Sequence, residues 1–295
     1  MLTPAIVNTV VSAALAEDAP WGDLTSQLLI PAGTIATARL VAREPGVFSG
    51  GVVFRAAFAL TDDTIDVSAV AADGARFDAG AVLAEVSGSA RGILQAERVA
   101  LNLVQRMSGI ASLTAAYVAE TVGTRARIVD TRKTTPGLRA FERQAVLDGG
   151  GHNHRFSLSD AVMAKDNHLA VLTAGGLSVT EALLGVRAQL SHTTHLEVEV
   201  DRLDQIEPVL AAGVDTIMLD NFTQHDLREG VAIVAGRAIV EASGGVTLDT
   251  VRAIAATGVD VISVGALTHS VRSLDLGLDI AIGTDDGADR REGPS

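Results

Sequence analysis

From residue 126 onward, short apolar runs alternate with helical patterns, and this alternation constrains the fold more than any other feature of the sequence. Strands that alternate with helices are typical of βαβ units, so we expect a parallel sheet. AAGVD at 211–215 and ATGVD at 256–260 predict one helix-to-strand turn used twice. The fold class is therefore α/β, with an incomplete parallel α/β barrel of about six to seven strands. The predicted strands are 126–132, 161–166, 195–200, 214–220, 237–243 and 259–265.

The chain before residue 109 has a different pattern. Helices are predicted over 4–17 and 52–60, and the remainder of 35–88 favours a small α+β unit with a mostly antiparallel sheet. Two more helices are expected, at 91–106 and 109–121, separated at Ser108. We expect a first domain over 1–108, a barrel domain over 109–267, a segment at 268–282 that returns to the first domain, and a disordered tail at 283–295.

Composition excludes several classes of partner and chemistry. A net charge of −13 argues against nucleic acid and anionic membranes, because both require a basic face. No apolar run approaches the ~18 residues needed to span a bilayer, and the N-terminal residues lack the cationic start of a signal peptide. The absence of cysteine excludes thiolate nucleophiles and disulfides and fits a reducing compartment, so we expect a cytoplasmic location.

Basic residues concentrate in one part of this acidic chain. The sequence has 21 arginines and only two lysines, Lys133 and Lys165, both near its middle. Residues 125–155 carry seven Arg or Lys against three acids. Lysine is a compact point charge whereas arginine is a planar fork, so retention of two lysines here indicates a need for an ammonium group, although chance is the alternative. The cluster predicts a small anionic ligand held in a cleft.

Polar residues stand at the ends of the predicted strands. Parallel barrels place their active sites at the carboxyl ends of the strands, so these residues are candidates for one site. Glu197 and Glu199 share one face of their strand, and a buried carboxylate requires a metal ion or a cationic partner. The strand-end candidates are Arg132, Lys133, Lys165, Glu199, Asp220, Ser243, Gly244, Gly245 and Gly265.

The loops after the last two strands are rich in small residues. Ser243-Gly244-Gly245 and the segment from Gly265 to His269 predict a phosphate site, because glycine lets backbone N–H groups approach an anion closely; ordinary turns are the alternative. Glu199 and Asp220 offer hard oxygen ligands that suit Mg²⁺ or a ribose, although a structural pair or an acid/base pair would have the same composition.

Three further features of the sequence bear on ligand binding. Gln95, Arg98, Asn102 and Gln105 form a polar stripe on one helix, which we expect to meet a ligand or another subunit unless it is simply solvated. The three glycines at 149–151 predict a flexible approach to a ligand, and the His152-Asn153-His154 motif that follows is a poor metal site because a third ligand is missing nearby. The segment 21–23 is expected to pack or to cap a helix.

Ordered motifs from about residue 16 to residue 280 resemble the quinolinate phosphoribosyltransferase family. They are DTRKTTPGLR at 130–139, GGGHNHR at 149–155, KDNH at 165–168, EVEVD at 197–201, LDN at 219–221, SGG at 243–245 and VGALTHS at 264–270. The resemblance implies an N-terminal open-faced sandwich joined to the barrel. It also implies a homodimer with shared active sites, possible higher assembly, and catalysis with Mg²⁺.

The resemblance further implies a role for each matched residue. Quinolinate would be bound by Arg132, His154, Arg155 and Lys165, with help from Arg139 and from Arg98 of the partner subunit. The phosphates of phosphoribosyl pyrophosphate (PRPP) would be bound by Lys133, Ser243, Gly244, Gly245, Gly265 and His269. Glu199 and Asp220 would contact the ribose and Mg²⁺, and together with Lys133 they are the expected catalytic residues.

Three alternatives remain at this point. The first is the molybdenum-transport-associated homologue of the same family, which would use another acceptor. The second is a lyase in which Lys165 forms a Schiff base, as a lysine at a strand end can do when it is deprotonated. The third is a ligand sensor that binds both substrates without catalysis.

Overall fold

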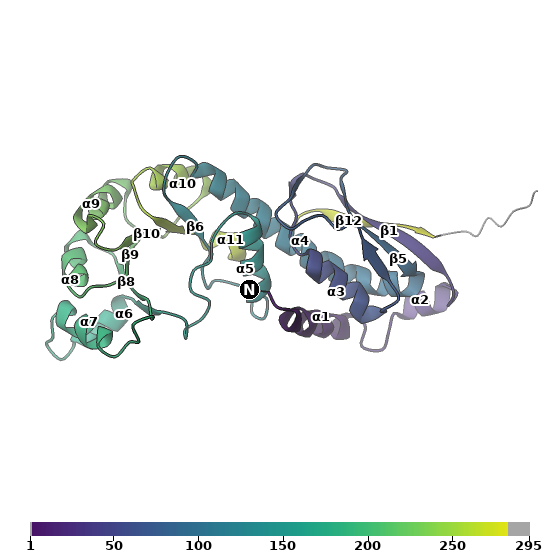
Figure 1. The fold of residues 1–295 in the computed structure, drawn as a ribbon, viewed down its shortest axis with the longest axis horizontal. Helices are drawn as coiled ribbons and strands as arrows, with labels where there is room; N and C mark the ends of the chain where they lie inside the picture. The colour runs from purple at the N-terminus through teal and green to yellow at the C-terminus, as the bar shows by residue number, and fades with distance from the viewer. Residues whose placement is uncertain (1, 283–295) are drawn as a thin grey trace, which may run out of the picture. The chain divides into compact units, whose positions relative to one another are not determined.

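The computed structural model describes residues 2–282, and the predicted tail at 283–295 lies outside the described residues (Figure 1). The chain divides into two compact units. One holds residues 107–272, and the other holds residues 2–106 together with the described residues from 273 onward. Within residues 2–282, no helix combines the length and the hydropathy needed to cross a membrane.

The first unit is built on a four-stranded antiparallel sheet with the order β12-β1-β5-β3. Every second residue of β1 is buried, which is the alternation of a sheet with one covered face. The helix α3 is one residue longer at each end than predicted, and it packs beside α1. The elements are α1 (Pro4–Asp18), α2 (Leu24–Leu29), β1 (Ile35–Ala42), β2 (Gly46–Val47), α3 (Gly51–Thr61), β3 (Asp66–Ser68), β4 (Arg76–Phe77), β5 (Val82–Ser89) and β12 (Leu276–Ile282).

A single 31-residue helix, α4 (Ala90–Glu120), replaces the two helices expected at 91–106 and 109–121. The expected break at Ser108 is wrong. Ser108 is fully buried, and its neighbours Met107 and Ile110 are buried with it. Serine interrupts a helix only weakly, and burial of the apolar residues on both sides outweighs that preference.

The second unit is organised around six parallel strands with the order β6-β11-β10-β9-β8-β7. Strands β6 and β7 lie at the two edges, so the prediction of an incomplete parallel barrel of about six to seven strands is confirmed, with six strands. The strands are β6 (Arg127–Val129), β7 (Val162–Ala164), β8 (Leu196–Val200), β9 (Thr216–Asp220), β10 (Ile239–Ser243) and β11 (Val261–Ser263).

Helices lie outside this sheet, as Figure 1 shows for α7 to α10. The echoed segments form the same turn, because Gly213 and Gly258 both have positive φ, of 70° and 95°. The elements are α5 (Arg139–Asp148), α6 (Asp166–Thr173), α7 (Val179–Arg187), the 3₁₀ turn Leu203–Gln205, α8 (Ile206–Leu210), α9 (Gln224–Val234), α10 (Leu248–Ala255) and α11 (Ala266–His269).

Two of the three glycines at 149–151 are required by packing, which is not the flexible approach to a ligand that we expected. A Cβ on Gly149 would lie 2.6 Å from the Cβ of Thr114, and one on Gly151 would lie 2.7 Å from its Cγ2. Both distances are too short for carbon atoms, so this turn can approach α4 only without side chains. Gly150, between them, has a positive φ of 85°.

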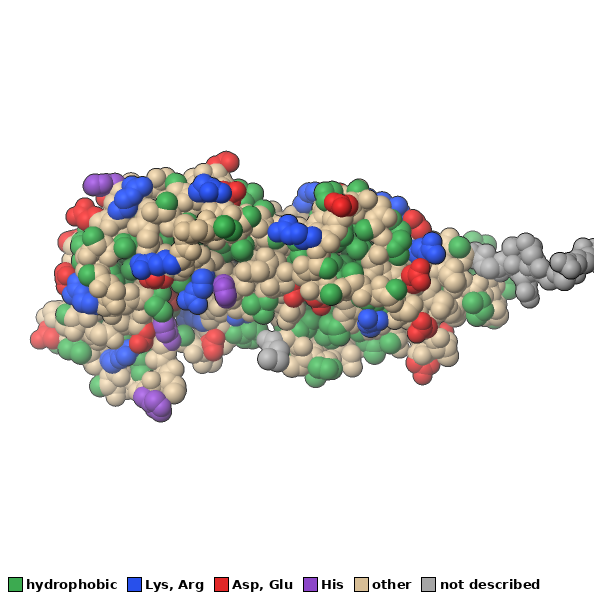
Figure 2. Space-filling view, turned by 45° about the horizontal axis from the view of Figure 1, so that its top comes forward, with side chains coloured by type: hydrophobic (Ala, Val, Ile, Leu, Met, Phe, Trp, Pro, Cys, Tyr) green, Lys and Arg blue, Asp and Glu red, His purple; other side chains and the backbone are tan. Residues whose placement is uncertain are grey.

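Charges of both signs are interspersed on the face shown in Figure 2. Several form exposed ion pairs, among them Arg252 with Glu120 at 2.8 Å and Arg39 with Glu85 at 3.1 Å. Such pairs contribute little to stability, because solvent screens them. The apolar interior of each unit therefore carries most of the folding free energy.

Candidate active site

The carboxyl ends of four neighbouring strands bring the predicted acids and small residues together. Ser243 pairs in register with Asp220 across β10 and β9. Lys165 directly follows β7, and its Nζ forms an ion pair with the carboxylate of Glu199 on β8. Glu199 thus has the cationic partner that its position on the strand predicted, and the Lys165 amine is engaged rather than free.

The loop after β10 requires glycine at its first position. Gly244 has φ 93°, and a Cβ there would lie 2.6 Å from the Cγ of Asn221. The backbone N–H of Asn221 donates to the carbonyl of Ser243 at 2.9 Å, and its side-chain amide donates to Asp220 at 2.7 Å. These contacts tie the loops after β9 and β10 together, so that Asp220, Ser243 and Gly244 form one surface.

A second group joins the loop after β6 to α11. The predicted strand 126–132 ends at Val129, so Lys133 lies in a loop. The hydroxyl of Thr268 donates to the carbonyl of Lys133 at 2.7 Å. A Cβ on Gly265 would lie 3.1 Å from Cδ of Lys133 and 3.0 Å from the ring of His269. The structure therefore brings Lys133, Gly265 and His269 together. All three were predicted to bind phosphate, and a shared phosphate site requires them to be close.

The predicted arginines occupy three kinds of environment. Nε of Arg132 is buried and donates to no described partner, whereas Arg139 donates to Thr134 at 3.0 Å and to the carbonyl of Phe156 at 3.1 Å. Arg155 donates to the carbonyl of Ala161 at 3.1 Å. Burial lowers the pKa of Arg155, and the positive charge of Arg132, the second-largest cause, lowers it further. Two neighbouring guanidinium groups favour an anion between them.

Arg98 belongs to the other unit and lies exposed on α4. The residues of its polar stripe differ in exposure, because Asn102 is exposed whereas Gln95 and Gln105 are half-buried. Gln95 accepts from the backbone N–H of Asp23 at 3.4 Å, and Gln105 donates to the carbonyl of Leu276 at 2.7 Å. The two glutamines are therefore structural, and only Arg98 and Asn102 remain available to a ligand or a second subunit.

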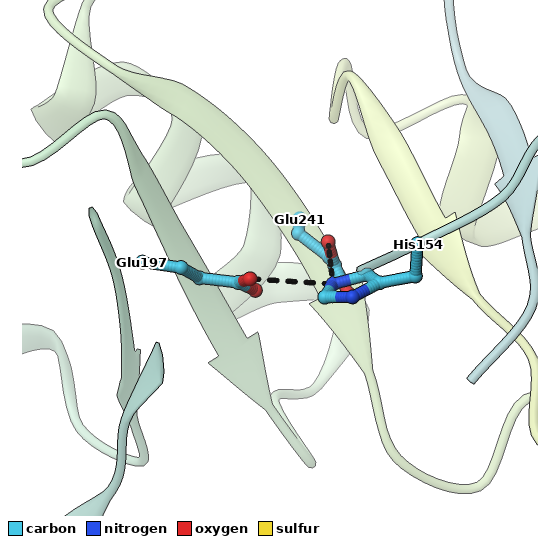
Figure 3. Close-up of side chains that lie close together, drawn as sticks. All are labelled: His154, Glu197 and Glu241. Atoms are coloured by element: carbon cyan, nitrogen blue, oxygen red, sulfur yellow. Dashed lines mark ion pairs between the residues drawn. The ribbon is translucent and has the colours of Figure 1, made fainter. Parts of the chain in front are cut away.

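His154 points into the barrel, where it meets two buried glutamates (Figure 3). Its Nε2 lies 3.2 Å from Glu197 of β8 and 3.3 Å from Glu241 of β10. Both glutamates are 3% exposed, and Oε1 of each has no described hydrogen-bond partner. Burial raises the pKa of Glu197. For His154, burial acts to lower the pKa, but hydrogen bonds to the two carboxylates outweigh it and raise the pKa.

The three side chains have the composition of a metal site, since their ligand atoms lie within 4.8 Å of one another. The fold thus brings two carboxylates to His154 that the sequence did not indicate, whereas His152 takes no part, so the two histidines of the motif are not a ligand pair. The other ring nitrogen argues for a proton instead of a metal. Nδ1 of His154 accepts the Arg155 N–H at 2.8 Å, whereas a metal-bound histidine normally donates from that nitrogen. The cluster is thus arranged to hold a proton between Nε2 and the carboxylates.

A cavity of about 410 Å³ reaches the cluster of His154, Glu197 and Glu241 from the amino ends of the strands. Its lining includes His154 and Arg155 together with the strand-start residues Arg127, Thr216 and Ile239. His154 and Arg155 therefore lie deeper in the barrel than Lys165, Glu199 and Asp220, which stand at the carboxyl ends of the strands.

Sequence reasoning did not select Glu241, Asp130 or Arg143. Glu241 could have been found, because Ile-Val-Glu-Ala-Ser places a carboxylate between the apolar residues of a buried strand, as the strand that carries Glu197 does. Asp130 is fully buried and pairs with Arg143 of α5 at 3.2 Å. No local pattern signals that pair, because its partners meet only through the tertiary fold.

The sequence matches one known family over both units. Residues 110–279 match the quinolinate phosphoribosyl transferase C-terminal domain, and residues 23–108 match the N-terminal domain. The chain is 46% identical over 276 residues to the nicotinate-nucleotide pyrophosphorylase (carboxylating) of Mycobacterium leprae (strain TN), which covers 90% of this chain and 94% of that protein. It is 41% identical over 266 residues to the probable nicotinate-nucleotide pyrophosphorylase (carboxylating) of Bacillus subtilis (strain 168), with 90% of each chain covered.

Solved structures show the same architecture. NadC from Streptococcus pyogenes superposes with a TM-score of 0.91 at 41% identity, covering 96% of this chain and 99% of that one. The nicotinate-nucleotide pyrophosphorylase from Francisella tularensis superposes with a TM-score of 0.88 at 35% identity, covering 95% and 98%. The ordered motifs, the six-stranded parallel sheet and these matches agree, and the chain belongs to the quinolinate phosphoribosyltransferase family.

Proposed function

We propose that this chain transfers the phosphoribosyl group of PRPP to quinolinate with decarboxylation, giving nicotinate mononucleotide, pyrophosphate and CO₂. The observation that carries the proposal is the arrangement of charge in the barrel unit. Arg132 and Arg155 are half-buried and close enough for their charges to interact, Lys165 and Lys133 stand at the mouth, and Glu199 and Asp220 lie at adjacent strand ends. A dicarboxylate and a polyphosphate are the substrates that such a distribution suits.

The acceptor, quinolinate, is assigned to the half-buried arginines. Arg132 and Arg155 bind the two carboxylates of quinolinate, with Lys165 at the rim and Arg139 in support. His154 shares this end of the site, although both of its ring nitrogens already have partners in the structure. Its contribution is therefore charge and position more than a direct hydrogen bond.

PRPP is assigned to the small-residue loops. Its phosphates take Lys133, His269 and the backbone N–H groups around Gly265 on one side, and Ser243, Gly244 and Gly245 on the other. Asp220 and Glu199 contact the ribose hydroxyls. Two hard carboxylates also fit Mg²⁺, which keeps water and substrate phosphates among its ligands. When bound there, Mg²⁺ would offset the charge of the departing pyrophosphate.

The reaction needs orientation and charge placement more than a special acid or base. The ring nitrogen of quinolinate attacks C1 of the ribose as the C1–O bond to pyrophosphate breaks. The new ring cation then accepts the electron pair of the adjacent C–CO₂ bond, CO₂ departs, and the ring carbon takes a proton. Arg132 and Arg155 hold the acceptor so that its nitrogen faces C1.

A homodimer with Arg98 supplied to the partner's site is part of the same proposal. Apolar side chains of α2 and of the segment before it are exposed: Trp21 is 92% exposed, and Leu28 and Leu29 are 74% exposed each. Of the segment 21–23, which we expected to pack or to cap a helix, Asp23 caps α2. Trp21 is exposed and does not pack within its own unit. This apolar face is fastened to α4 near Arg98, because Arg91 donates to the carbonyl of Ile30 at 2.7 Å.

Light scattering on the Leu28→Asp variant tests the dimer. The proposal predicts that the wild-type protein has at least twice the mass of one chain and that the variant loses this mass. An unchanged mass in the variant would show that α2 does not lie in the interface.

Acceptor selectivity tests the activity. With PRPP and Mg²⁺, pyrophosphate release is expected with quinolinate and not with nicotinate, because nicotinate lacks the second carboxylate that the paired arginines bind. Release with nicotinate, or with neither acceptor, would reject the assignment of the acceptor pocket.

A further inference from the structure

The segment that carries His154 and Arg155 is held by a fully buried carboxylate. Asp130 is 0% exposed. Its Oδ1 accepts the backbone N–H of His154 at 2.7 Å and Nη1 of Arg143 at 3.2 Å, and its Oδ2 accepts the side-chain amide of Asn153 at 2.9 Å. A single side chain thus fixes two consecutive residues of the segment.

Arg143 completes the attachment from α5. Its Nη2 donates to the carbonyl of His154 at 2.6 Å, and its Nη1 donates to the carbonyl of Arg155 at 3.2 Å. The guanidinium also lies 5.3 Å from the ring centre of Phe156. Such a planar fork can reach Asp130 and two successive carbonyls at once, which a lysine ammonium cannot do.

A buried ion pair of this kind is weak evidence for stability. Removing two charges from water costs as much as their attraction returns, and apolar residues of similar volume often stabilise a protein equally well. Its distinctive contribution is geometric. Asp130 and Arg143 set the backbone from which the Arg155 side chain leaves, while Glu197 of β8 and Glu241 of β10 anchor the ring of His154 (Figure 3).

We propose that Asp130 and Arg143 are positioning residues that fix the acceptor end of the active site by holding the backbone of His154 and Arg155. The inference rests on the proposed function. Neither residue is assigned a contact with substrate. The PRPP loops around Gly244 and Gly265 receive no described hydrogen bond from either side chain, so disturbance of the pair should affect quinolinate selectively.

The test is steady-state kinetics of Arg143→Lys with each substrate varied in turn. We expect the KM for quinolinate to rise about tenfold to a hundredfold, because small displacements of a positioning group have effects of that size. The KM for PRPP should change by less than about twofold. Arg187→Lys is the matched control, since Arg187 pairs with Asp215 at 2.7 Å on the surface. It should leave both KM values unchanged.

A merely structural role predicts a different result. It would lower the melting temperature and the amount of active enzyme, and it would leave the KM for quinolinate unchanged or raise both KM values equally. Either result overturns the proposal. Should Arg143→Lys not fold, Asp130→Asn carries the same test, because it keeps the acceptor for His154 N–H and removes the charge. If neither variant folds, the pair is required for folding and the proposal is abandoned.

Wild-type enzyme in the same assay separates the two levels of the account. Absence of turnover with quinolinate and PRPP would reject the proposed function and the positioning inference with it. Normal wild-type turnover combined with equal changes in both KM values would reject the positioning inference alone.

Discussion

Lys165 and Glu199 form an ion pair across the carboxyl ends of the neighbouring strands β7 and β8. The pair lies at the barrel mouth, with the lysine side chain 44% exposed and the glutamate 16%. Lys165 thereby places a positive charge at the rim of the proposed acceptor pocket and neutralises a carboxylate that would otherwise repel both anionic substrates.

Replacement of Lys165 should therefore weaken quinolinate binding. Lys165→Ala removes the cation and leaves Glu199 unpaired, so we expect the KM for quinolinate to rise about tenfold or more. Lys165→Arg should restore part of the loss, because it returns the charge without the same geometry. An unchanged KM in the alanine variant would contradict the assignment. Borohydride treatment with substrate should trap no adduct on Lys165, in contrast to a Schiff-base lyase.

Arg155→Ala is predicted to weaken quinolinate binding tenfold to a few hundredfold. A charge-assisted hydrogen bond to a carboxylate is worth about 1.5–3 kcal/mol, which converts to that range. Isothermal titration with quinolinate measures it. Arg228→Ala is the control, because Arg228 is exposed on α9 and donates only to the carbonyl of Gln224 at 3.4 Å among the described contacts. Near-normal affinity of the Arg155 variant would remove this residue from the site.

The two adjacent glycines after β10 should differ in their tolerance of a methyl group. Gly244→Ala places a Cβ against Asn221 at a φ of 93°, whereas Gly245 has φ 59° and open space around it. We expect Gly244→Ala to lower the melting temperature and raise the KM for PRPP severalfold. Gly245→Ala should cost only the strain of a left-handed residue, about 1–2 kcal/mol. Equal effects of the two substitutions would contradict the close approach of the loops.

The raised pKa of Asp130 leads us to expect weaker quinolinate binding at acidic pH. Burial raises the pKa of its carboxyl from 3.8 to about 6, although Arg143, His154 and Asn153 act to lower it. Because the folded-state pKa exceeds the unfolded one, its contribution to stability falls as pH rises from about 3.8 to about 6. The attachment to Arg143 needs the ionised form, so quinolinate binding should improve as the pH rises through about 6.

The measurement is the pH profile of kcat/KM for quinolinate in the wild type and in Asp130→Asn. The wild type should lose activity below about pH 6, and the variant should lose that acidic limb while remaining weak throughout. Quinolinate itself titrates equally in both assays, so the variant serves as the control. An acidic limb of the same shape in both proteins would assign it to another group.

Much of the barrel could be predicted because its strands are short and bounded by turn signals. The alternation from residue 126 and the echoed turns at Gly213 and Gly258 specify parallel units locally. The break predicted at Ser108 failed for the opposite reason. A weak local preference was outweighed by burial along α4, which the sequence around Ser108 does not reveal.

The site was predictable where chemistry follows directly from position on a strand. Lys165, Glu199 and Asp220 stand at strand ends, and that alone marks them as candidates. Asp130 and Arg143 could not be predicted, because their partnership depends on how α5 packs beside the segment after Gly151. The three glycines were misjudged because a tight packing requirement and a flexible loop have the same composition.

The most direct measurement uses quinolinate labelled in the carboxyl group next to the ring nitrogen. Labelled CO₂ and pyrophosphate are counted in one reaction with PRPP and Mg²⁺. The account predicts equal amounts of the two products, and no labelled CO₂ when PRPP is omitted. Pyrophosphate without CO₂, or CO₂ without PRPP, would contradict a decarboxylating phosphoribosyl transfer by this chain.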